Sequence, residues 1–272
     1  MRVDPVEKHL FLEGILMKYG YDFRQYSEAS LNRRLTSILG DKRSLLGVLD
    51  EILSDSTKFQ KLLPRLTVNT TEPFRDPRFY RSIREHVVPV LKTYPLLNVW
   101  SAGCSTGEEL YSLLILFKEE GLFDRTTFFA TDISPEALSK AKLGIYSHEV
   151  VQQFTRNYTE AGGTRAPSEY YTAEYGSVCF DSRLRENVVF SDHNLVVDDV
   201  FTEMNLILCR NVLIYFNRNL QNKVLELFDR SLAAKGFLGL GSRESIRFSS
   251  IYNKFEDVDK AQRIYRKLGS SQ

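Results

Sequence analysis

Cysteine and histidine are scarce in this chain of 272 residues, and their scarcity excludes several kinds of site. The three cysteines, Cys104, Cys179 and Cys209, are odd in number, widely spaced and form no Cys-x-x-Cys pair. This pattern argues against a disulfide framework and against a zinc site, and it fits a reducing compartment. The four histidines do not cluster either. We therefore predict no metal centre.

Long apolar runs and an excess of charge are also missing. No apolar run approaches the roughly 18 residues that a membrane span needs, and no secretory segment opens the chain. The formal net charge is +1, so no overall field draws the protein to nucleic acid or to a membrane. We expect a cytoplasmic protein with no nucleic-acid partner and no membrane insertion.

The first part of the chain has helical periodicity only. In "SLNRRLTSILG", the residues Leu31, Leu35, Ile38 and Leu39 fall on one helix face, and Gly40 suits the end of that helix. Similar repeats follow without any strand between them. We predict a small all-helical domain over residues 1–66, followed by a linker and bridging helix over 67–95, where two prolines and several Thr and Asn residues mark "TVNTTEPFRDP".

From Leu96 onward, strand-like and helix-like segments alternate. This alternation predicts an α/β domain over residues 96–272, with a mostly parallel sheet and helices on both of its faces. Residues 145–187 interrupt the rhythm with turn-rich sequence and short alternating runs. We expect a small inserted subdomain there, helical at first and then antiparallel β.

The stretch "VWSAGCSTGEELYSL" fits two kinds of site. As G-x-S-x-G, it is the nucleophile elbow of a serine hydrolase, with Ser105 as nucleophile and His148 or His193 as base. That interpretation is disfavoured, because an elbow normally follows several strands and this turn follows the first. As a glycine-rich loop, the stretch holds a nucleotide-like cofactor at the carboxyl end of a strand, with Gly103 allowing a sharp bend close to the ligand.

The cofactor interpretation predicts an acidic residue at the end of the next strand, to bind ribose hydroxyls. Asp132 stands there, 25 residues after Gly107, and Ser134 is the better cap for the following helix. Glu108 and Glu109 begin the first helix and would repel a pyrophosphate. They favour S-adenosylmethionine, which carries an ammonium and no phosphate. The alternative is that both glutamates only complement the helix dipole.

Five motifs in order, "TVNTTEPFRDP", "WSAGCSTGEELYSL", "ATDIS", "FSDHNL" and "LILCRNVLIYF", resemble the chemotaxis receptor methyltransferases, the CheR family. The resemblance covers nearly the whole chain. It implies a seven-stranded, mostly parallel methyltransferase sheet, S-adenosylmethionine as cofactor and S-adenosylhomocysteine as product. It further implies methylation of glutamate side chains on a methyl-accepting chemoreceptor or similar helical signalling protein.

The resemblance also implies roles for individual residues. At the methionine end of the cofactor it places Arg210 and Asn211, with Glu108 in preference to Glu109 at the amino group. It places Asp132 at the ribose, and Asn194 and Leu195 beside the adenine. The linker contributes Asn69, Thr71 and Arg75, in addition to Gly103 of the glycine-rich turn. Arg210 and Tyr215 are the candidate catalytic residues. The alternatives are a linker arginine bonded to the protein's own acids for Arg75, a packed aromatic for Tyr215 and a turn residue for Asn211.

Two departures from the family pattern, Pro73 and Leu110, remove no polar contact but leave the acceptor open. The alternative functions are a non-catalytic cofactor-binding module and a methyltransferase with another acceptor, such as a small molecule.

Two docking features are also expected. A basic stretch of the front domain could meet an acidic helix, namely Arg24, Arg33, Arg34, Lys42 and Arg43, although a solvated face explains it equally well. In some family members the insertion grips a receptor-tail peptide by strand addition.

Overall fold

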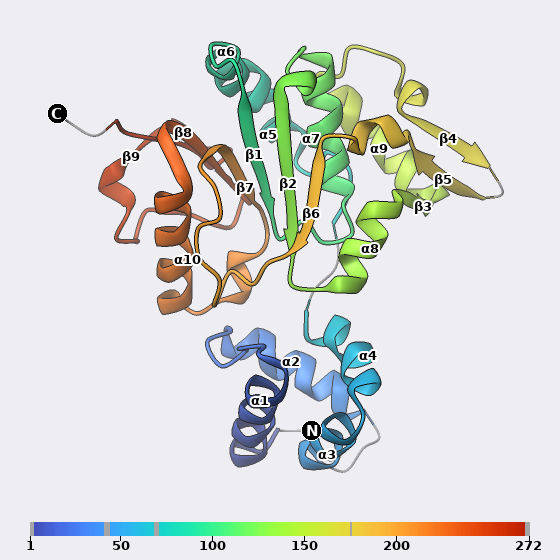
Figure 1. Ribbon diagram of the computed structural model, residues 1–272, viewed down its shortest axis with the longest axis vertical. Coiled ribbons are helices and arrows are strands. Elements are labelled where there is room, and N and C mark those ends of the chain that lie inside the picture. Colours follow the sequence, from blue (N-terminus) through green and yellow to red (C-terminus); the bar gives the residue numbers. More distant parts are fainter. Residues whose placement is uncertain (1–2, 41–43, 68–70, 175, 270–272) are drawn as a thin grey trace.

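The computed structural model describes residues 3–40, 44–67, 71–174 and 176–269. The chain begins with four helices, α1 (Pro5–Tyr19), α2 (Glu28–Leu39), α3 (Leu45–Ser54) and α4 (Ser56–Leu66). Figure 1 shows them as a group that faces the lower ends of the central strands. The apolar face predicted for α2 is buried: Leu31, Leu35, Ile38 and Leu39 are each at most 5% exposed.

A bent helical segment joins this group to the sheet. It comprises α5 (Pro77–Ser82), a π-helical turn η1 (Ile83–Val87) and α6 (Val88–Leu91). Phe79 and Tyr80 of α5 are almost fully buried. The segment therefore packs on the sheet as part of its cover.

The main sheet has seven strands in the order β6-β2-β1-β7-β8-β10-β9. Their bounds are β1 (Leu97–Ala102), β2 (Thr126–Asp132), β6 (Val188–Asp192), β7 (Met204–Cys209), β8 (Leu232–Leu240), β9 (Phe255–Asp259) and β10 (Ile264–Lys267). The first five strands of that order are parallel, and β10 is antiparallel to β8 and β9. This arrangement confirms the predicted fold class.

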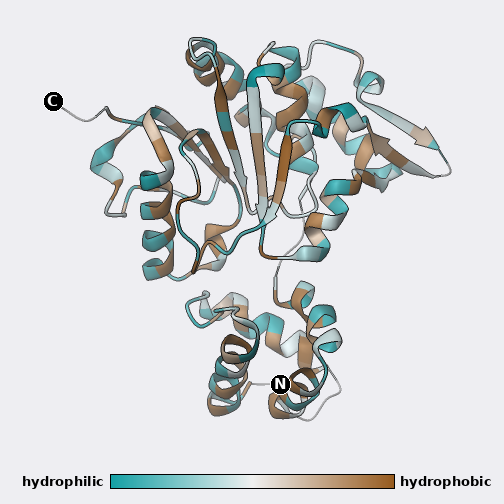
Figure 2. Ribbon diagram, in the orientation of Figure 1, coloured by the Kyte–Doolittle hydropathy of each residue, from teal (hydrophilic) through white to brown (hydrophobic). Residues whose placement is uncertain are grey.

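Helices cover both faces of this sheet, as Figure 1 shows. They include α7 (Glu108–Glu119), α8 (Pro135–Leu143) and α10 (Arg218–Ser231). The coloured ribbon in Figure 2 shows hydrophobic strands in the middle and a hydrophilic outer face on α10. Burial of these strand and helix faces supplies most of the driving force for folding. No helix in the described part of the chain combines the length and apolar character needed to cross a membrane.

The insertion carries its own small sheet. Its elements are β3 (Ile145–Ser147), α9 (His148–Glu160), β4 (Tyr171–Glu174) and β5 (Ser177–Phe180), and the antiparallel strands are ordered β3-β5-β4. In this order β4 lies at an edge. Peptide binding by strand addition to the insertion stays a prediction.

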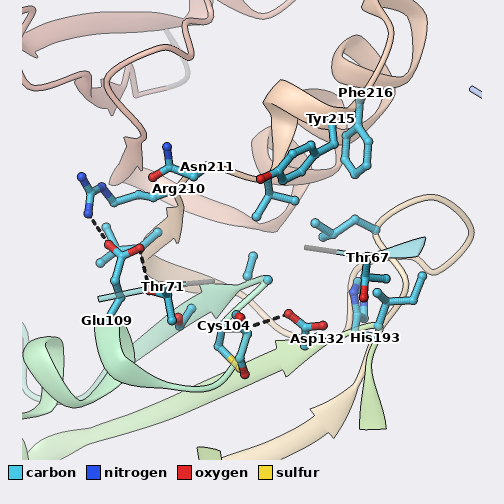
Figure 3. Close-up of a pocket in the computed structure, with 18 of the residues that line it drawn as sticks. Thr67, Thr71, Cys104, Glu109, Asp132, His193, Arg210, Asn211, Tyr215 and Phe216 are labelled. Carbon is cyan, nitrogen blue, oxygen red and sulfur yellow. Dashed lines mark hydrogen bonds and ion pairs between the residues drawn. The ribbon is translucent and has the colours of Figure 1, made fainter. Parts of the chain in front are cut away.

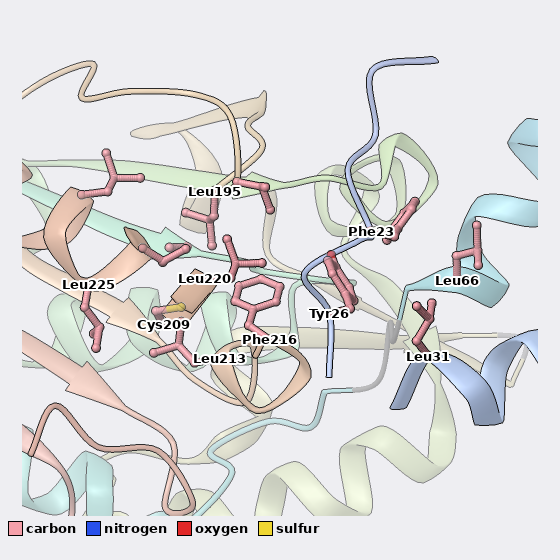
Figure 4. Close-up of a cluster of buried hydrophobic side chains, with 14 of the residues drawn as sticks. Phe23, Tyr26, Leu31, Leu66, Leu195, Cys209, Leu213, Phe216, Leu220 and Leu225 are labelled. Atoms are coloured by element: carbon pink, nitrogen blue, oxygen red, sulfur yellow. The ribbon is translucent and has the colours of Figure 1, made fainter. Parts of the chain in front are cut away.

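The front helices share a hydrophobic core with one face of the sheet. Figure 4 shows Tyr26 of the front segment beside Phe216, and Leu31 and Leu66 farther along. Tyr26 and Phe216 form an antiparallel backbone bridge, and their ring centroids lie 5.1 Å apart. The Ser27 N–H also donates to the Tyr215 carbonyl oxygen over 2.7 Å. These contacts fasten the start of α2 to the segment that follows β7.

Candidate active site

A pocket opens at the carboxyl ends of β1, β2 and β7, the edge at which open α/β sheets bind ligands (Figure 3). Ten of the predicted site residues line it: Thr71, Arg75, Gly103, Glu109, Asp132, Asn194, Leu195, Arg210, Asn211 and Tyr215. Asn69 lies outside the described residues. The front part of the chain contributes Tyr26, which precedes α2, and Arg34 of α2 to the wall, and sequence reasoning assigned neither of them to this pocket.

The glycine-rich turn after β1 forms the floor of the pocket. Gly103 has a φ of 73°, and a Cβ on it would come within 2.5 Å of the Val212 side chain. Only glycine combines that backbone angle with so close an approach. The N–H groups of Gly103 and Cys104 donate to the Thr131 carbonyl oxygen, which ties the turn to the end of β2.

Asp132 braces this turn and also faces the pocket. Its Oδ2 accepts a 2.8 Å hydrogen bond from the Ser105 N–H, and its Oδ1 accepts a 2.9 Å hydrogen bond from the Ser134 N–H. Ser134 caps α8 as expected. Burial raises the pKa of the Asp132 carboxyl, and the two backbone hydrogen bonds act in the opposite direction. The remaining lone pairs of Asp132 are available to hydroxyl donors.

The structure corrects the preference for Glu108 over Glu109. The Glu108 side chain does not line the pocket; it is buried and accepts a 2.6 Å hydrogen bond from the Thr106 hydroxyl. Burial raises the pKa of its carboxyl. Glu109 does line the pocket, where its Oε2 accepts a 3.3 Å hydrogen bond from Thr71. The two glutamates project differently because consecutive helical residues point about 100° apart.

Arg210 is committed to the protein's own acids. Its guanidinium pairs with Glu109 and, over 2.6 Å, with Asp76, and it donates to the Arg75 carbonyl oxygen over 3.0 Å. It also stacks over the Phe79 ring. Burial acts to lower the pKa of Arg210, but attraction to Glu109 and the other acids outweighs it and raises that pKa. The contacts do not leave Arg210 free for an acceptor carboxylate, contrary to the predicted catalytic role.

A buried glutamate that sequence reasoning missed holds the loop after β7. The Glu244 carboxylate accepts hydrogen bonds from the N–H groups of Gly241, Asn211 and Ile214 over 2.7 to 3.2 Å. Burial raises the pKa of its carboxyl. Asn211 has a φ of 61°, and its Oδ1 is buried without a partner among the described residues. The sequence signal that could have indicated Glu244 is its position soon after the buried strand β8.

The other end of the pocket is apolar and partly aromatic. Leu195 is 8% exposed, and His193 lies edge-on to Trp100 with ring centroids 5.2 Å apart. The Asn194 Oδ1 accepts a hydrogen bond from the Val196 N–H, which shapes the loop after β6. This end suits a flat, largely apolar ring such as a nucleobase.

Tyr215 and Arg75 each bring a polar group without a described partner to the pocket. Within the described part of the chain, no hydrogen bond is made by the Tyr215 hydroxyl and no ion pair by the Arg75 guanidinium. The Tyr215 ring lies 4.6 Å from the guanidinium carbon of Arg34. These contacts do not support a linker arginine bonded to the protein's own acids.

The contacts exclude the disfavoured hydrolase interpretation and alter one docking hypothesis. The Ser105 hydroxyl is buried and has no hydrogen-bond partner in the described chain, so no base activates it. The prediction that the basic residues of the front domain form one continuous docking surface is wrong. Arg24 pairs with Glu13 and Asp22, Arg34 is buried, and Lys42 and Arg43 lie outside the described residues. Among the three of these residues that the structure describes, only Arg33 is an exposed cation without an ion pair.

Comparison with known proteins identifies the family. Residues 69–264 match the model of the CheR methyltransferase, SAM binding domain. The chain belongs to the CheR methyltransferase family. It is 50% identical to the Pseudomonas putida protein named "Putative methyltransferase Cher3", over 98% of each chain. It is 32% identical to the "Chemotaxis protein methyltransferase" of Escherichia coli, over 83% of this chain and 77% of that protein.

The chain is thus an S-adenosylmethionine-dependent methyltransferase, and the pocket fits that cofactor. A carboxylate, Glu109, lies at one end for an ammonium group, and Asp132 lies beyond the glycine-rich turn for hydroxyl donors. The unpartnered Asn211 Oδ1 is a buried acceptor that a donor from the cofactor can satisfy. No phosphate-binding cation cluster lies on the turn itself.

Proposed function

We propose that this chain transfers the methyl group of S-adenosylmethionine to glutamate side-chain carboxylates of a methyl-accepting chemoreceptor or similar helical signalling protein. The observation that carries the proposal is that the Tyr215 hydroxyl and the Arg75 guanidinium line the pocket without a described hydrogen bond or ion pair to the protein. A hydroxyl and a guanidinium are donors suited to a carboxylate. The name of the Escherichia coli relative supports a receptor acceptor.

The residues divide into three groups along the pocket. Glu109 faces the methionine ammonium, with Thr71 and Asn211 beside it, and Arg210 acts by holding Glu109 in place. Asp132 binds the ribose, while Gly103 lets the backbone approach it. Leu195 and Asn194 flank the adenine. Each of these residues lines the pocket.

The bound cofactor supplies an electrophilic methyl group on a sulfonium. A glutamate carboxylate has an ordinary pKa of about 4.3 and is ionised at neutral pH, so it needs no general base. The chain's task is to orient this carboxylate in line with the methyl group and to exclude bulk water. We assign that task to Tyr215 and Arg75. Arg210 takes a positioning role.

The test combines cofactor binding with transfer. Calorimetry with S-adenosylhomocysteine establishes the pocket, and labelled S-adenosylmethionine with a purified chemoreceptor signalling fragment measures transfer. We expect base-labile methyl esters on glutamates, and a loss of at least tenfold in turnover for Tyr215→Phe with cofactor affinity retained. Binding without transfer to any fragment would favour the non-catalytic module. Transfer to small carboxylic acids but not to fragments would favour another acceptor.

A further inference from the structure

Arg34 is a buried cation in the pocket wall with unfilled donors. It is 6% exposed, and α2 of the front helices carries it into the lining of the pocket. Its Nη1 donates to the Leu66 carbonyl oxygen, whereas its Nε and Nη2 are buried and have no hydrogen-bond partner in the described chain. No described Asp or Glu pairs with it. A buried guanidinium without a counter-ion is costly, and an anion is the partner that would offset this cost most fully.

The two unfilled groups share one edge of the guanidinium. Nε–H and Nη2–H project in parallel, and this is the edge that binds a carboxylate through two hydrogen bonds at once. The carbon of the same guanidinium lies over the Tyr215 ring, 4.6 Å from its centroid. The Ser27 N–H and the Tyr215 carbonyl oxygen hold the two segments together. An anion on this edge of Arg34 therefore lies beside Tyr215.

The cofactor's own carboxylate is the less suitable occupant. In the cofactor, one carbon carries both the amino group and the carboxylate. If the ammonium group binds to Glu109, the cofactor's carboxylate must therefore also lie near Glu109. Figure 3 shows Glu109 and Tyr215 on different sides of the pocket. Arg34 is left for a second anion.

We propose that Arg34 anchors the carboxylate of the methyl-accepting glutamate through Nε and Nη2 and orients it beside Tyr215. The inference rests on the proposed function. Each carboxylate oxygen held in this way keeps a second lone pair. One such pair forms the new O–C bond to the methyl group, while the C–S bond breaks and its electrons stay on sulfur. The products are a methyl ester and a neutral thioether, and no proton is transferred.

The test is a double-mutant cycle between Arg34 and the acceptor charge. The probes are a purified chemoreceptor signalling fragment that the wild type methylates, and the same fragment with its acceptor glutamates changed to glutamine. Their affinities for the S-adenosylhomocysteine complex are measured for wild type and Arg34→Met. We expect glutamine to weaken binding to the wild type by at least tenfold and to Arg34→Met by less than twofold. Arg33→Met, the exposed neighbour, should keep the wild-type difference.

If Arg34→Met and the change of the acceptor glutamates to glutamine affect the binding free energy additively, the proposal is overturned, while glutamate methylation itself remains possible. A tenfold loss of S-adenosylhomocysteine affinity in Arg34→Met would overturn it in favour of the cofactor carboxylate. Failure of the wild type to methylate any fragment would instead remove the proposed function, and this inference with it. Where Arg34→Met does not fold, Arg34→Lys enters the same cycle, because it keeps the charge but loses the parallel donors. If changing the acceptor glutamates to glutamine weakens binding to Arg34→Lys as much as binding to the wild type, the proposed role of Arg34 is also rejected.

Discussion

The Ser105 N–H donates to the Asp132 carboxylate over 2.8 Å, so one side chain both shapes the glycine-rich turn and faces the pocket. A carboxylate in this position couples the conformation of the turn to the binding of hydroxyl donors. Loss of its charge should weaken both.

Asp132→Asn should lower the affinity for S-adenosylhomocysteine by at least tenfold. Charge-assisted hydrogen bonds contribute about 1.5–3 kcal/mol, and tenfold corresponds to about 1.4 kcal/mol. Calorimetry measures the change. Asp192→Asn is the matched control, because Asp192 pairs with Asp132 in the sheet register but is exposed. Equal effects of the two variants would contradict the role of Asp132.

Glu109→Gln should weaken S-adenosylhomocysteine binding by about tenfold or more, because it removes the carboxylate that faces the pocket. Glu108→Gln should change the affinity by less than twofold, since Glu108 lies behind the turn and the amide oxygen can still accept from Thr106. The same calorimetric titration compares both variants. A larger loss for Glu108→Gln would restore the assignment made from the sequence.

The stability of Glu108→Gln should depend on pH in a defined direction. Burial raises the pKa of the Glu108 carboxyl above its ordinary value of about 4.3. This carboxyl therefore stabilises the fold below that value and loses the contribution as pH rises through its folded pKa. Glutamine does not ionise. The melting temperature of Glu108→Gln minus that of the wild type should therefore rise from about pH 5 to about pH 8.

The control for this pH effect is Glu149→Gln. Glu149 is exposed, and a hydrogen bond from Ser147 lowers the pKa of its carboxyl, which is the opposite direction. Its variant should show no rise in relative melting temperature over the same range. If the melting temperature of Glu108→Gln minus that of the wild type falls with pH instead, burial does not favour the protonated form of Glu108 as described.

Arg210→Met should lower the free energy of unfolding by about 3 kcal/mol, because it leaves the largely buried Glu109 without its cation. Urea denaturation measures this loss. The double variant Arg210→Met, Glu109→Gln should recover at least half of it, since the uncompensated charge is gone. No recovery would mean that Arg210 acts through its packing on Phe79 rather than through Glu109.

Local signals were sufficient for the sheet and the turn. The alternation after Leu96 predicted parallel strands, and the position of Asp132 at the end of the second strand followed from motif spacing. The choice between Glu108 and Glu109 was beyond the sequence, because adjacent residues differ only in which side of α7 they face. That direction is set by the packing of α7 in the hydrophobic core.

The contribution of the front helices to the pocket was also beyond motif reasoning. Arg34 lies three residues after Leu31 and four before Ile38, so it occupies the apolar face of α2. A charge in that stripe was a signal, but it was counted with exposed Arg33 as part of a basic surface. The pairing of Tyr26 with Phe216 spans 190 residues of chain, and no local pattern reports such a contact.

The bridge between Tyr26 and Phe216 makes the front helices inseparable from the chamber in which a methyl acceptor would lie. A chimera that exchanges residues 1–66 with those of a relative would exchange part of that chamber together with the outer surface. Any altered choice of target in such a hybrid would then have two origins, and restoring Tyr26 and Arg34 alone would tell them apart.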